Sequence, residues 1–553
     1  MAANGAMQEV RPSFESQEGL CEAGVLFALP ALISQGLLKF KDIYEALPAG
    51  YYGFESIVLT FAIMALCRIK NPEQLKQCKV GELGRIIGLD RLPETKNLRH
   101  KLKQIVLQHK AKDFNTLLLN QWLGNEQNTI FYIDGHQHVY FGDKATLTSK
   151  YISRQKLCMA ATTEYWVNDG TGLPYLVVTG ELSETLREMI ELQIIPQLLQ
   201  TDLIQKRQQA NEEILFTLVF DREAYEPAFF HRLSEKKIAI VTYRKNVQDK
   251  WDESLFEPFD VKVINNNVPM RLYEQSVTLG GYVFREVRRL GENGHQTSVI
   301  TTHPKITTAV IAGEMFSRWS QENFFRYARS DYYLDTIAEF GIEPIDENKS
   351  VVNPPYRRLS YRIKKQKEKI ARLKAKLFSI VEQVNNSEID HLPELTVKQA
   401  EQMLEVERLQ TELNQFEAER APLPARIKLK EMPPEKRYNK LKTESKLFLN
   451  IIKMICYRAE TALAELVMPH FAKERTEKRM LIKQIFSSPA NLTVNEKERT
   501  LTVDLYTLST ERANFAVEQL CEILNQTQTC FPATDLVMKF KTTADLSTKG
   551  QEF

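Results

Sequence analysis

The chain has 553 residues, of which 43% are hydrophobic and 26% charged, and its formal net charge is only +2. This length predicts three or four domains, each with its own core, and the ordinary composition excludes a largely disordered protein. A nearly neutral chain gives no electrostatic argument for a polyanionic partner, so any nucleic-acid surface must come from local clusters of basic residues.

The N-terminal residues and the cysteines predict a cytoplasmic protein. Residues 1–19 lack a basic start followed by an apolar run, so we expect no secretory signal and a disordered N-terminus. Seven cysteines without a C-x-x-C pair are typical of reduced structural thiols in the cytoplasm. The longest apolar run, residues 57–67, is too short to cross a bilayer and predicts a buried helix.

Residues 20–125 predict short helices separated by Gly and Pro, which we take as a candidate DNA-binding domain. The last of these helices carries four basic residues, Lys96, Arg99, Lys101 and Lys103. They suit a helix-turn-helix, but they are equally typical of the solvated face of an amphipathic helix. Both interpretations stay open.

From residue 128 the pattern changes to strands that alternate with helices. Strands are predicted over 129–140, 156–167, 173–179, 214–220 and 238–243, and helices over 183–205 and 223–236 between the last three strands. This is the order of a ribonuclease H-like α/β core, which we assign to residues 126–250 and 309–350. The alternating segments of residues 251–308 predict a β-rich insertion in that core.

The C-terminal part is predicted to be mainly helical. After the chain break NPPY, apolar residues from Leu359 to Leu377 recur at heptad spacings, and residues 397–419 form a second helix. Residues 351–437 are therefore predicted to form an antiparallel coiled-coil arm. Residues 438–553 predict a long helix followed by a small α+β domain.

The first helix of the arm is strongly basic, with ten basic residues and one acid, Glu368, between Arg357 and Leu377. This density predicts a surface that tracks DNA phosphates, with binding that weakens as salt rises. The alternative is a coiled coil whose partner helix, rich in glutamate from Glu401 to Glu419, neutralises it. Neither interpretation is excluded.

Three acids are candidates for chemistry. Asp134 lies within the first core strand, Asp221 ends the fourth, and Glu322 lies on a long helix predicted after the insertion. Each has a structural explanation when taken alone: a turn with Gly135, a helix cap, and an Arg-Glu pair along a helix. Because the first and fourth strands are neighbours in this core order, we expect the three carboxylates to converge at one point.

Converging carboxylates repel each other unless cations compensate them. Hard oxygen ligands favour Mg²⁺ or Mn²⁺, and two such ions about 4 Å apart stabilise the attacking and leaving oxygens of phosphoryl transfer. Met315, Arg318, Glu322 and Arg329 follow each other at spacings of three, four and seven residues, which confines them to an arc of roughly 60° on a single helix.

With these motifs the chain resembles the DDE transposases of bacterial insertion sequences, in particular the branch whose third acid lies in a Tyr-x2-Arg-x3-Glu-x6-Lys signature. Met315, Arg318, Glu322 and Arg329 match these positions, with Met in place of Tyr and Arg in place of Lys. The DREA run that starts at Asp221 is also similar. GYYGFES, RWSQENFFRYAR, VNPPYR and FPATDL resemble a family of transposases of about this length.

The resemblance implies a DDE-type polynucleotidyl transferase and endonuclease, in which metal-activated water cuts DNA at the element ends and the freed 3′-hydroxyl attacks target DNA. Asp134 and Asp221 would be catalytic metal ligands, the first shared by two Mg²⁺ or Mn²⁺ ions, and Glu322 would bind the second ion. Arg318 and Arg329 would hold the DNA phosphates, and Arg222 is a weaker candidate for the same role.

The implied partner is double-stranded DNA, as element ends and as target, bound by a homodimer in the cytoplasm or at the nucleoid. No membrane partner and no small-molecule substrate are expected. Two alternatives remain open: a catalytically inactive DNA-binding derivative, and a structural coiled-coil scaffold protein.

An H-x-H pair, His136 and His138, lies on the strand face of Asp134, and such pairs can ligate a transition metal. No third His or Cys stands at a suggestive spacing. The sequence therefore disfavours a zinc site at this strand.

Overall fold

The computed structural model describes residues 9–124, 129–152, 154–180, 184–264, 266–336, 341–386, 392–471 and 475–543. The chain forms two compact units, residues 1–141, 150–341 and 442–553 in the first and residues 142–149 and 342–441 in the second. The mixed α/β class predicted from the sequence is confirmed. The segments predicted as separate N-terminal, core and C-terminal domains, however, share the first unit and one continuous hydrophobic core.

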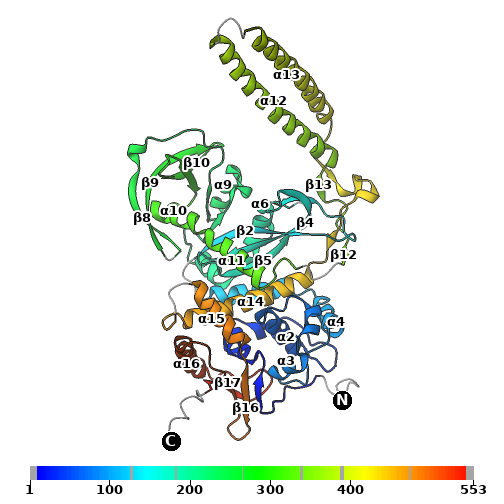
Figure 1. Ribbon diagram of the computed structural model, residues 1–553, viewed down its shortest axis with the longest axis vertical. Coiled ribbons are helices and arrows are strands. Elements are labelled where there is room, and N and C mark those ends of the chain that lie inside the picture. Colours follow the sequence, from blue (N-terminus) through cyan, green and yellow to red (C-terminus); the bar gives the residue numbers. More distant parts are fainter. Residues whose placement is uncertain are drawn as a thin grey trace. The chain divides into compact units, whose positions relative to one another are not determined.

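A ten-stranded sheet dominates the first unit (Figure 1). β2 (Ile130–Val139) pairs antiparallel with β4 (Leu157–Asn168) and parallel with β6 (Phe216–Phe220). β7 (Ile238–Tyr243) lies parallel beside β6, and β5 (Pro174–Gly180) pairs antiparallel with β4. These are the five predicted core strands in the predicted chain order, joined at one edge by a short strand that was not predicted, β3 (Ser149–Ile152).

Helices connect the parallel strands, as a right-handed crossover requires. Between β5 and β6 the chain forms α6 (Leu186–Met189), a π-helical turn (Ile190–Ile194), α7 (Ile195–Leu199) and α8 (Asp202–Gln209), and between β6 and β7 it forms α9 (Pro227–Glu235). The predicted helix over 183–205 is thus divided, and its residue 183 lies outside the described residues. Thr185 caps α6 through a capping box with Glu188.

The segment predicted as a β-rich insertion extends the same sheet. It forms β8 (Glu257–Val263), β9 (Asn266–Leu279), β10 (Tyr282–Leu290) and β11 (Gln296–Thr301). β11 pairs antiparallel with β7, with Val299 opposite Tyr243. The prediction of strands in this region is confirmed. Through the pairing of β11 with β7 they belong to the same sheet as the core strands.

The long helix predicted to carry Glu322 is broken. α10 (Thr308–Ser317) ends at Arg318, and α11 (Trp319–Asp331) starts immediately after it. Met315 on α10 is fully buried among side chains of the sheet, whereas Glu322 on α11 is exposed. The prediction that Met315 shares one helix face with Glu322 is therefore wrong, because a single continuous helix was assumed.

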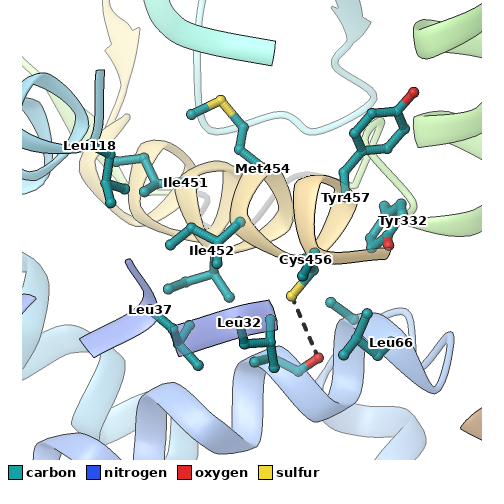
Figure 2. Packing of buried hydrophobic residues seen from close by; sticks show 14 of the residues in the cluster. Leu32, Leu37, Leu66, Leu118, Tyr332, Ile451, Ile452, Met454, Cys456 and Tyr457 are labelled. Atoms are coloured by element: carbon teal, nitrogen blue, oxygen red, sulfur yellow. Dashed lines mark hydrogen bonds between the residues drawn. The ribbon is translucent and has the colours of Figure 1, made fainter. Parts of the chain in front are cut away.

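α14 (Glu444–Leu466) runs through the main core (Figure 2). Its apolar side chains, among them Ile451 and Ile452, pack with Leu32 and other residues of the N-terminal helices. One of these, α2 (Phe54–Leu66), is buried along most of its length, as predicted. Among the described helices, none is long and apolar enough to cross a membrane.

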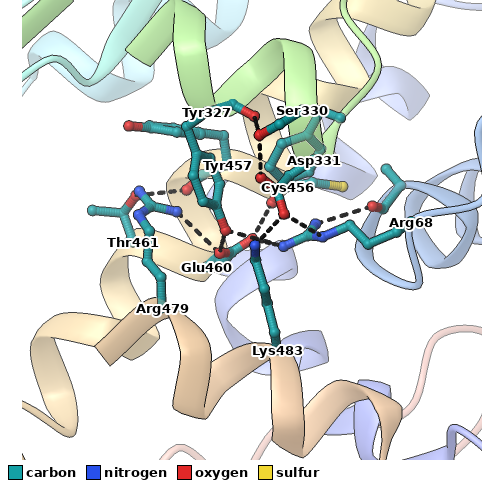
Figure 3. Close-up of polar contacts among 12 residues, drawn as sticks. Arg68, Tyr327, Ser330, Asp331, Cys456, Tyr457, Glu460, Thr461, Arg479 and Lys483 are labelled. Carbon is teal, nitrogen blue, oxygen red and sulfur yellow. Dashed lines mark hydrogen bonds and ion pairs between the residues drawn. The ribbon is translucent and has the colours of Figure 1, made fainter. Parts of the chain in front are cut away.

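A buried carboxylate on α14 joins several elements (Figure 3). Oε1 of Glu460 accepts hydrogen bonds from Arg479 Nη1 at 3.1 Å and from the Tyr327 hydroxyl, and Oε2 accepts from Arg68 Nη2 at 2.7 Å and from the Tyr332 hydroxyl. Burial would raise the pKa of Glu460, but the charges of Arg68 and Arg479 outweigh it and lower the pKa to about 2.

A smaller four-stranded sheet contains strands from both ends of the described chain. β16 (Ala490–Asn495), β17 (Thr500–Leu505) and β18 (Val537–Thr542) are joined by β1 (Gln17–Leu20), next to α15 (Arg475–Ser487) and α16 (Glu511–Gln526). The prediction of disorder over residues 1–19 is wrong for residues 9–19, because Phe14 packs on Phe531 at 4.7 Å between ring centroids and β1 pairs with β16. Residues 1–8 lie outside the described residues.

The second unit contains two long helices, α12 (Pro354–Asn386) and α13 (Leu392–Arg420), which run antiparallel (Figure 1). Ile363, Ile370, Leu409 and Leu413 form their buried seam. Short two-stranded pairings join the chain on either side of the helices: β13 (Ser350–Val352) with β14 (Arg426–Lys428), and β12 (Ile342–Glu343) with β15 (Lys440–Leu441).

Candidate catalytic site

Asp134 and Asp221 occupy matching positions on neighbouring parallel strands. Ile133 of β2 lies opposite Phe220 of β6, and each acid is the next residue along the chain. β6 ends at Phe220, whereas β2 continues to Val139 with β4 as its partner. Asp134 therefore lies on β2 where its pairing with β6 stops, and Asp221 lies just beyond the carboxyl end of β6, a place where sites form in α/β sheets.

Backbone groups hold both carboxylates. Oδ1 of Asp134 accepts the Gly135 amide at 2.9 Å, and Oδ1 of Asp221 accepts the Arg222 amide at 2.6 Å as the cap of a 3₁₀ turn. The structural roles considered for each acid alone are thus present. They do not neutralise either carboxylate, since an amide carries no net charge.

Arg318 is the cation that lies between the two acids. Its guanidinium is 3.5 Å from Asp134 Oδ2 and 3.8 Å from Asp221 Oδ1, and its side chain is 12% exposed. The break between α10 and α11 places Arg318 at the start of α11.

Gln321 fixes this start. Its side-chain amide donates to the carbonyls of Tyr132 and Trp166 at 3.2 and 3.1 Å and to Asn168 Oδ1 at 2.8 Å. α11 is therefore anchored on β2 and β4.

The carboxylate of Asp134 is only partly compensated. Burial raises its pKa to about 6, Arg318 and the Gly135 amide oppose that rise, and the charges of Asp221 and Glu223 add to it. The side chain keeps 28% of its surface exposed, and that of Asp221 keeps 51%. A carboxyl group with a raised pKa that is still accessible to solvent is typical of a site that binds a cation or transfers a proton.

The structure places Glu322 near these acids without joining it to them. Glu322 is exposed on α11, one turn after Arg318, and no contact between it and Asp134 or Asp221 is found in the described part of the chain. Its charge does act on Tyr243, as do those of Arg318 and Asp221. The expected convergence of the three acids is thus seen for two of them, with the third on the adjoining helix turn.

The other two predicted arginines, Arg222 and Arg329, lie on different elements. Arg222 is exposed directly after Asp221, and its guanidinium lies over the Tyr243 ring at 5.4 Å. Arg329 is half-buried on α11, seven residues after Glu322 and therefore on the same helix face.

The donor set fits a divalent cation with oxygen ligands. Two carboxylates side by side, one with a raised pKa, carry more negative charge than the single Arg318 compensates. Mg²⁺ and Mn²⁺ prefer such carboxylate oxygens. Asp134 and Asp221 are the residues that would hold the ion, with Glu322 as a third ligand from α11.

Sequence reasoning missed two neighbours of the acids. Tyr243 ends β7, opposite the position of Asp221, because Phe220 pairs with Thr242. Glu223 adds its charge to Asp134 and Asp221. Glu223 lies in the DREA run and could have been noticed, whereas Tyr243 needed the register between β6 and β7.

Glu314, an acid on α10, lies in a different environment from Glu322. It accepts a hydrogen bond from the Tyr132 hydroxyl and lines a cavity of about 460 Å³ with Asp169 and Lys262. Tyr132 precedes Asp134 by two residues on β2, so Glu314 lies toward the other end of that strand.

The basic helix α12 is partly neutralised by α13. Lys367 pairs with Glu417 at 2.7 Å and Lys369 with Glu405 at 3.4 Å. These pairs support the interpretation of an acidic partner helix. Other basic residues of α12, such as Arg372, are exposed, so the interpretation of a phosphate-binding surface also stays open.

The N-terminal basic helix is α4 (Thr95–Val106). Its apolar face is buried, Lys101 is buried and donates to the Pro48 carbonyl at 3.2 Å, and Arg99 pairs with Glu73 at 2.7 Å. Two of its four basic residues are therefore engaged within the protein, which favours the amphipathic-helix interpretation.

Comparison with known proteins gives a family and distant similarity to solved structures. The sequence model of a family described as "Transposase protein" matches residues 1–544. Among solved structures, a piggyBac transposase in a synaptic complex with hairpin DNA is similar at 10% identity and a TM-score of 0.30, over 56% of this chain and 66% of that chain, just under two thirds. A TM-score this low carries no argument. No curated protein matches the sequence.

Proposed function

This chain belongs to the transposase protein family, and from that premise we propose that it is a DDE-type DNA transposase. It would cut DNA at the ends of a mobile element and transfer the freed strand to target DNA. The observation that carries the proposal is that Asp134 and Asp221 each follow the Ile133–Phe220 pair of two neighbouring parallel strands and share Arg318 as a cation. The strand order of the core is also the order expected of a ribonuclease H-like fold.

In this proposal Asp134, Asp221 and Glu322 of α11 are the residues that would hold the Mg²⁺ or Mn²⁺ ions. When bound, the ions supply charge stabilisation for the attacking and leaving oxygens of the phosphodiester. The two aspartates are fixed by the Gly135 and Arg222 amides and by their strands, so they are positioned before the ions arrive.

Arg318 has two roles in the proposal. In the structure its guanidinium partly compensates the charges of Asp134 and Asp221. A guanidinium at this place can also donate charge-assisted hydrogen bonds to the phosphate oxygens of bound DNA. Arg222 and Arg329 would hold phosphates farther along the DNA.

Tyr243 adds a phenol to the site. The signature of the resembling branch has a tyrosine where this chain has the buried Met315. The Tyr243 side chain, at the end of the strand next to Asp221, can donate a hydrogen bond to a DNA phosphate in its place.

The test is Mg²⁺- or Mn²⁺-dependent nicking of supercoiled and linear-duplex DNA by the full chain. Activity should disappear in Asp134→Ala, Asp221→Ala and Glu322→Ala, and Glu257→Ala, an exposed acid of β8, should retain it. Duplex binding that falls steeply with salt, without nicking by the wild type, would favour the inactive DNA-binding derivative. A chain that neither binds nor cuts DNA would favour the structural scaffold.

The finer assignments follow from the same proposal. Selection of bound fragments from random duplex DNA would identify the element ends, and their terminal repeats would test the bacterial insertion-sequence branch. Light scattering with and without those fragments would test whether a homodimer forms on DNA.

A further inference from the structure

Two histidines and a carboxylate form a compact group beside the proposed catalytic acids. His136 and His138 lie on β2, and Asp335 follows α11. Nε2 of His136 is 2.6 Å from Asp335 Oδ1, and Nδ1 of His138 is 3.6 Å from the same oxygen. One ligand atom from each residue lies within 4.8 Å of the others. The second carboxylate oxygen of Asp335 faces Arg154 at 3.6 Å, so Oδ1 alone points at the two imidazoles.

His138 is a buried histidine that faces a carboxylate from each ring nitrogen. Its side chain is 2% exposed, and Nε2 lies 2.8 Å from Glu164 Oε2. Nδ1 lies 3.6 Å from Asp335 Oδ1, which is too far for a hydrogen bond, and has no other hydrogen-bond partner among the described residues. A buried polar atom without a partner costs about 1–3 kcal/mol, so such atoms usually have one.

We propose that His136, His138 and Asp335 bind one divalent transition-metal ion of the Zn²⁺ class, at a site separate from that of Asp134 and Asp221. Two imidazoles and one carboxylate suit Zn²⁺, whereas Mg²⁺ prefers oxygen ligands alone. Glu164, fully enclosed behind His138, is placed to orient that imidazole from its far nitrogen, as carboxylates behind metal-bound histidines do.

The competing explanation is an ion-pair cluster held by Lys446. Its ammonium donates to the carbonyls of Leu334 and Thr336, and its charge acts on Glu164 and Asp335. Lys446 therefore fixes the backbone around Asp335. It makes no described hydrogen bond to His138, so Nδ1 of that ring stays available to another ligand, and the hydrogen bond between His136 and Asp335 would be replaced by metal ligation.

The site would link the strand of Asp134 to the helix of Arg318 and Glu322. His136 stacks on Phe325 of α11 at 5.0 Å between ring centroids, and Asp335 lies four residues after the end of that helix. An ion here would hold α11 against β2 from its C-terminal side, opposite the Gln321 anchor at its start.

The experiment is competition for Zn²⁺ between the full chain and a chromophoric chelator, with Co²⁺ absorption as a second readout. It is done without DNA in the Asp134→Ala/Asp221→Ala background, so that its outcome is independent of the proposed cleavage. We expect one Zn²⁺ per chain, at least roughly 100-fold weaker binding in His138→Gln, and about 10- to 100-fold weaker binding in Glu164→Gln. His231→Gln, a half-exposed histidine on α9, should bind normally.

Absence of stoichiometric binding in this background would overturn the proposal, as would binding that His138→Gln leaves unchanged. If His138→Gln does not fold, Asp335→Asn takes its place, because that side chain is 49% exposed and tolerates substitution better. Asp335→Asn should then weaken Zn²⁺ binding at least about tenfold and change the Co²⁺ spectrum. Unchanged affinity and spectrum would indicate the ion-pair cluster instead.

Discussion

Glu460 and Asp134 are both acids of the first unit, but their carboxylates differ in how fully neighbouring groups compensate the negative charge. Glu460 is fully buried, and each of its oxygens accepts one hydrogen bond from an arginine and one from a tyrosine. Asp134 is partly open and has one amide at 2.9 Å and one guanidinium at 3.5 Å. The pKa of Glu460 falls to about 2, whereas that of Asp134 rises to about 6.

The difference separates a structural carboxylate from the one that we propose binds metal. A carboxylate that folding compensates completely has no capacity left for a ligand, and its removal breaks a network. A carboxylate that folding leaves undercompensated lowers stability but can attract a cation. The two residues can therefore be distinguished by how stability and activity respond to their substitution.

Glu460→Ala should produce the largest change in stability. Its removal leaves the buried guanidiniums of Arg68 and Arg479 without their common partner, which typically costs about 3–5 kcal/mol. Urea unfolding monitored by circular dichroism measures the loss. Glu465→Ala, an exposed acid on the same helix, should change the free energy of unfolding by less than about 0.5 kcal/mol. Equal effects of the two substitutions would contradict a structural role for the network.

Asp134→Asn should reduce activity strongly and should not reduce stability. Loss of a metal ligand should slow nicking by roughly 10³-fold, or about 4 kcal/mol in activation free energy, while the protein stays folded. Without divalent ions, the folded protein binds a proton at Asp134 more tightly than the unfolded chain does, so at pH 7.5 the ionised side chain costs stability. The variant should therefore be more stable than wild type by roughly 1–2 kcal/mol.

The sign of that difference can be checked by its pH dependence. The stabilising effect of Asp134→Asn should fade as the pH falls through about 6 toward the ordinary carboxyl pKa near 4, where wild type is protonated in both states. The contribution of Glu460 is present above its ordinary pKa and is lost only as the pH falls toward about 2. Parallel curves for Asp134→Asn and wild type from pH 4 to 8 would refute the assignment of the raised pKa.

The nicking rate should also depend on pH, and this change should be smaller than the effect of Asp134→Asn. Protons compete with metal for Asp134 below pH 6, so at subsaturating Mn²⁺ the nicking rate should fall by up to about tenfold per pH unit. Arg318→Gln removes the cation that lowers this pKa, so the acidic limb should move to higher pH. The measurement is the initial nicking rate from pH 5 to 8. A limb that stays in place in Arg318→Gln would show that Asp134 does not control it.

Tyr243→Phe should have the smallest effect. It removes one hydroxyl from the end of β7 and leaves the ring under Arg222, so nicking should fall by about 3- to 10-fold without a change in the free energy of unfolding. Tyr282→Phe, on β10, where the ring stacks on His231 of α9, is the control and should cut normally. A loss comparable to that of Asp134→Asn would mean that Tyr243 does more than hold a phosphate.

Most elements of the core could be predicted because their signals are local. The apolar runs of β6 and β7 and the alternation in β2 follow from a strand period of two, and α2 follows from an uninterrupted apolar segment. The strand order then placed Asp134 and Asp221 on neighbouring strands, and the register between β2 and β6 agrees with that expectation.

Other features depended on partners far away in the sequence. At the helix break at Arg318, Gln321 donates hydrogen bonds to the backbone of β2 and β4. The periodicity of a helix cannot predict such contacts with distant segments. The Glu460 network draws on Arg68, Tyr327 and Arg479 from three separate segments, and the histidine pair gained its carboxylate, Asp335, only through the fold.

The sequence by itself determined most of the segments that become strands and helices, and it supplied the acids that we propose bind metal, because periodicity and residue type are properties of short stretches. Only the tertiary structure decided which acids of the chain are neutralised, as Glu460 is, and which keep an uncompensated charge, as Asp134 does. Charge compensation depends on distances between side chains, and those distances are set when strands pair in register and helices pack across them.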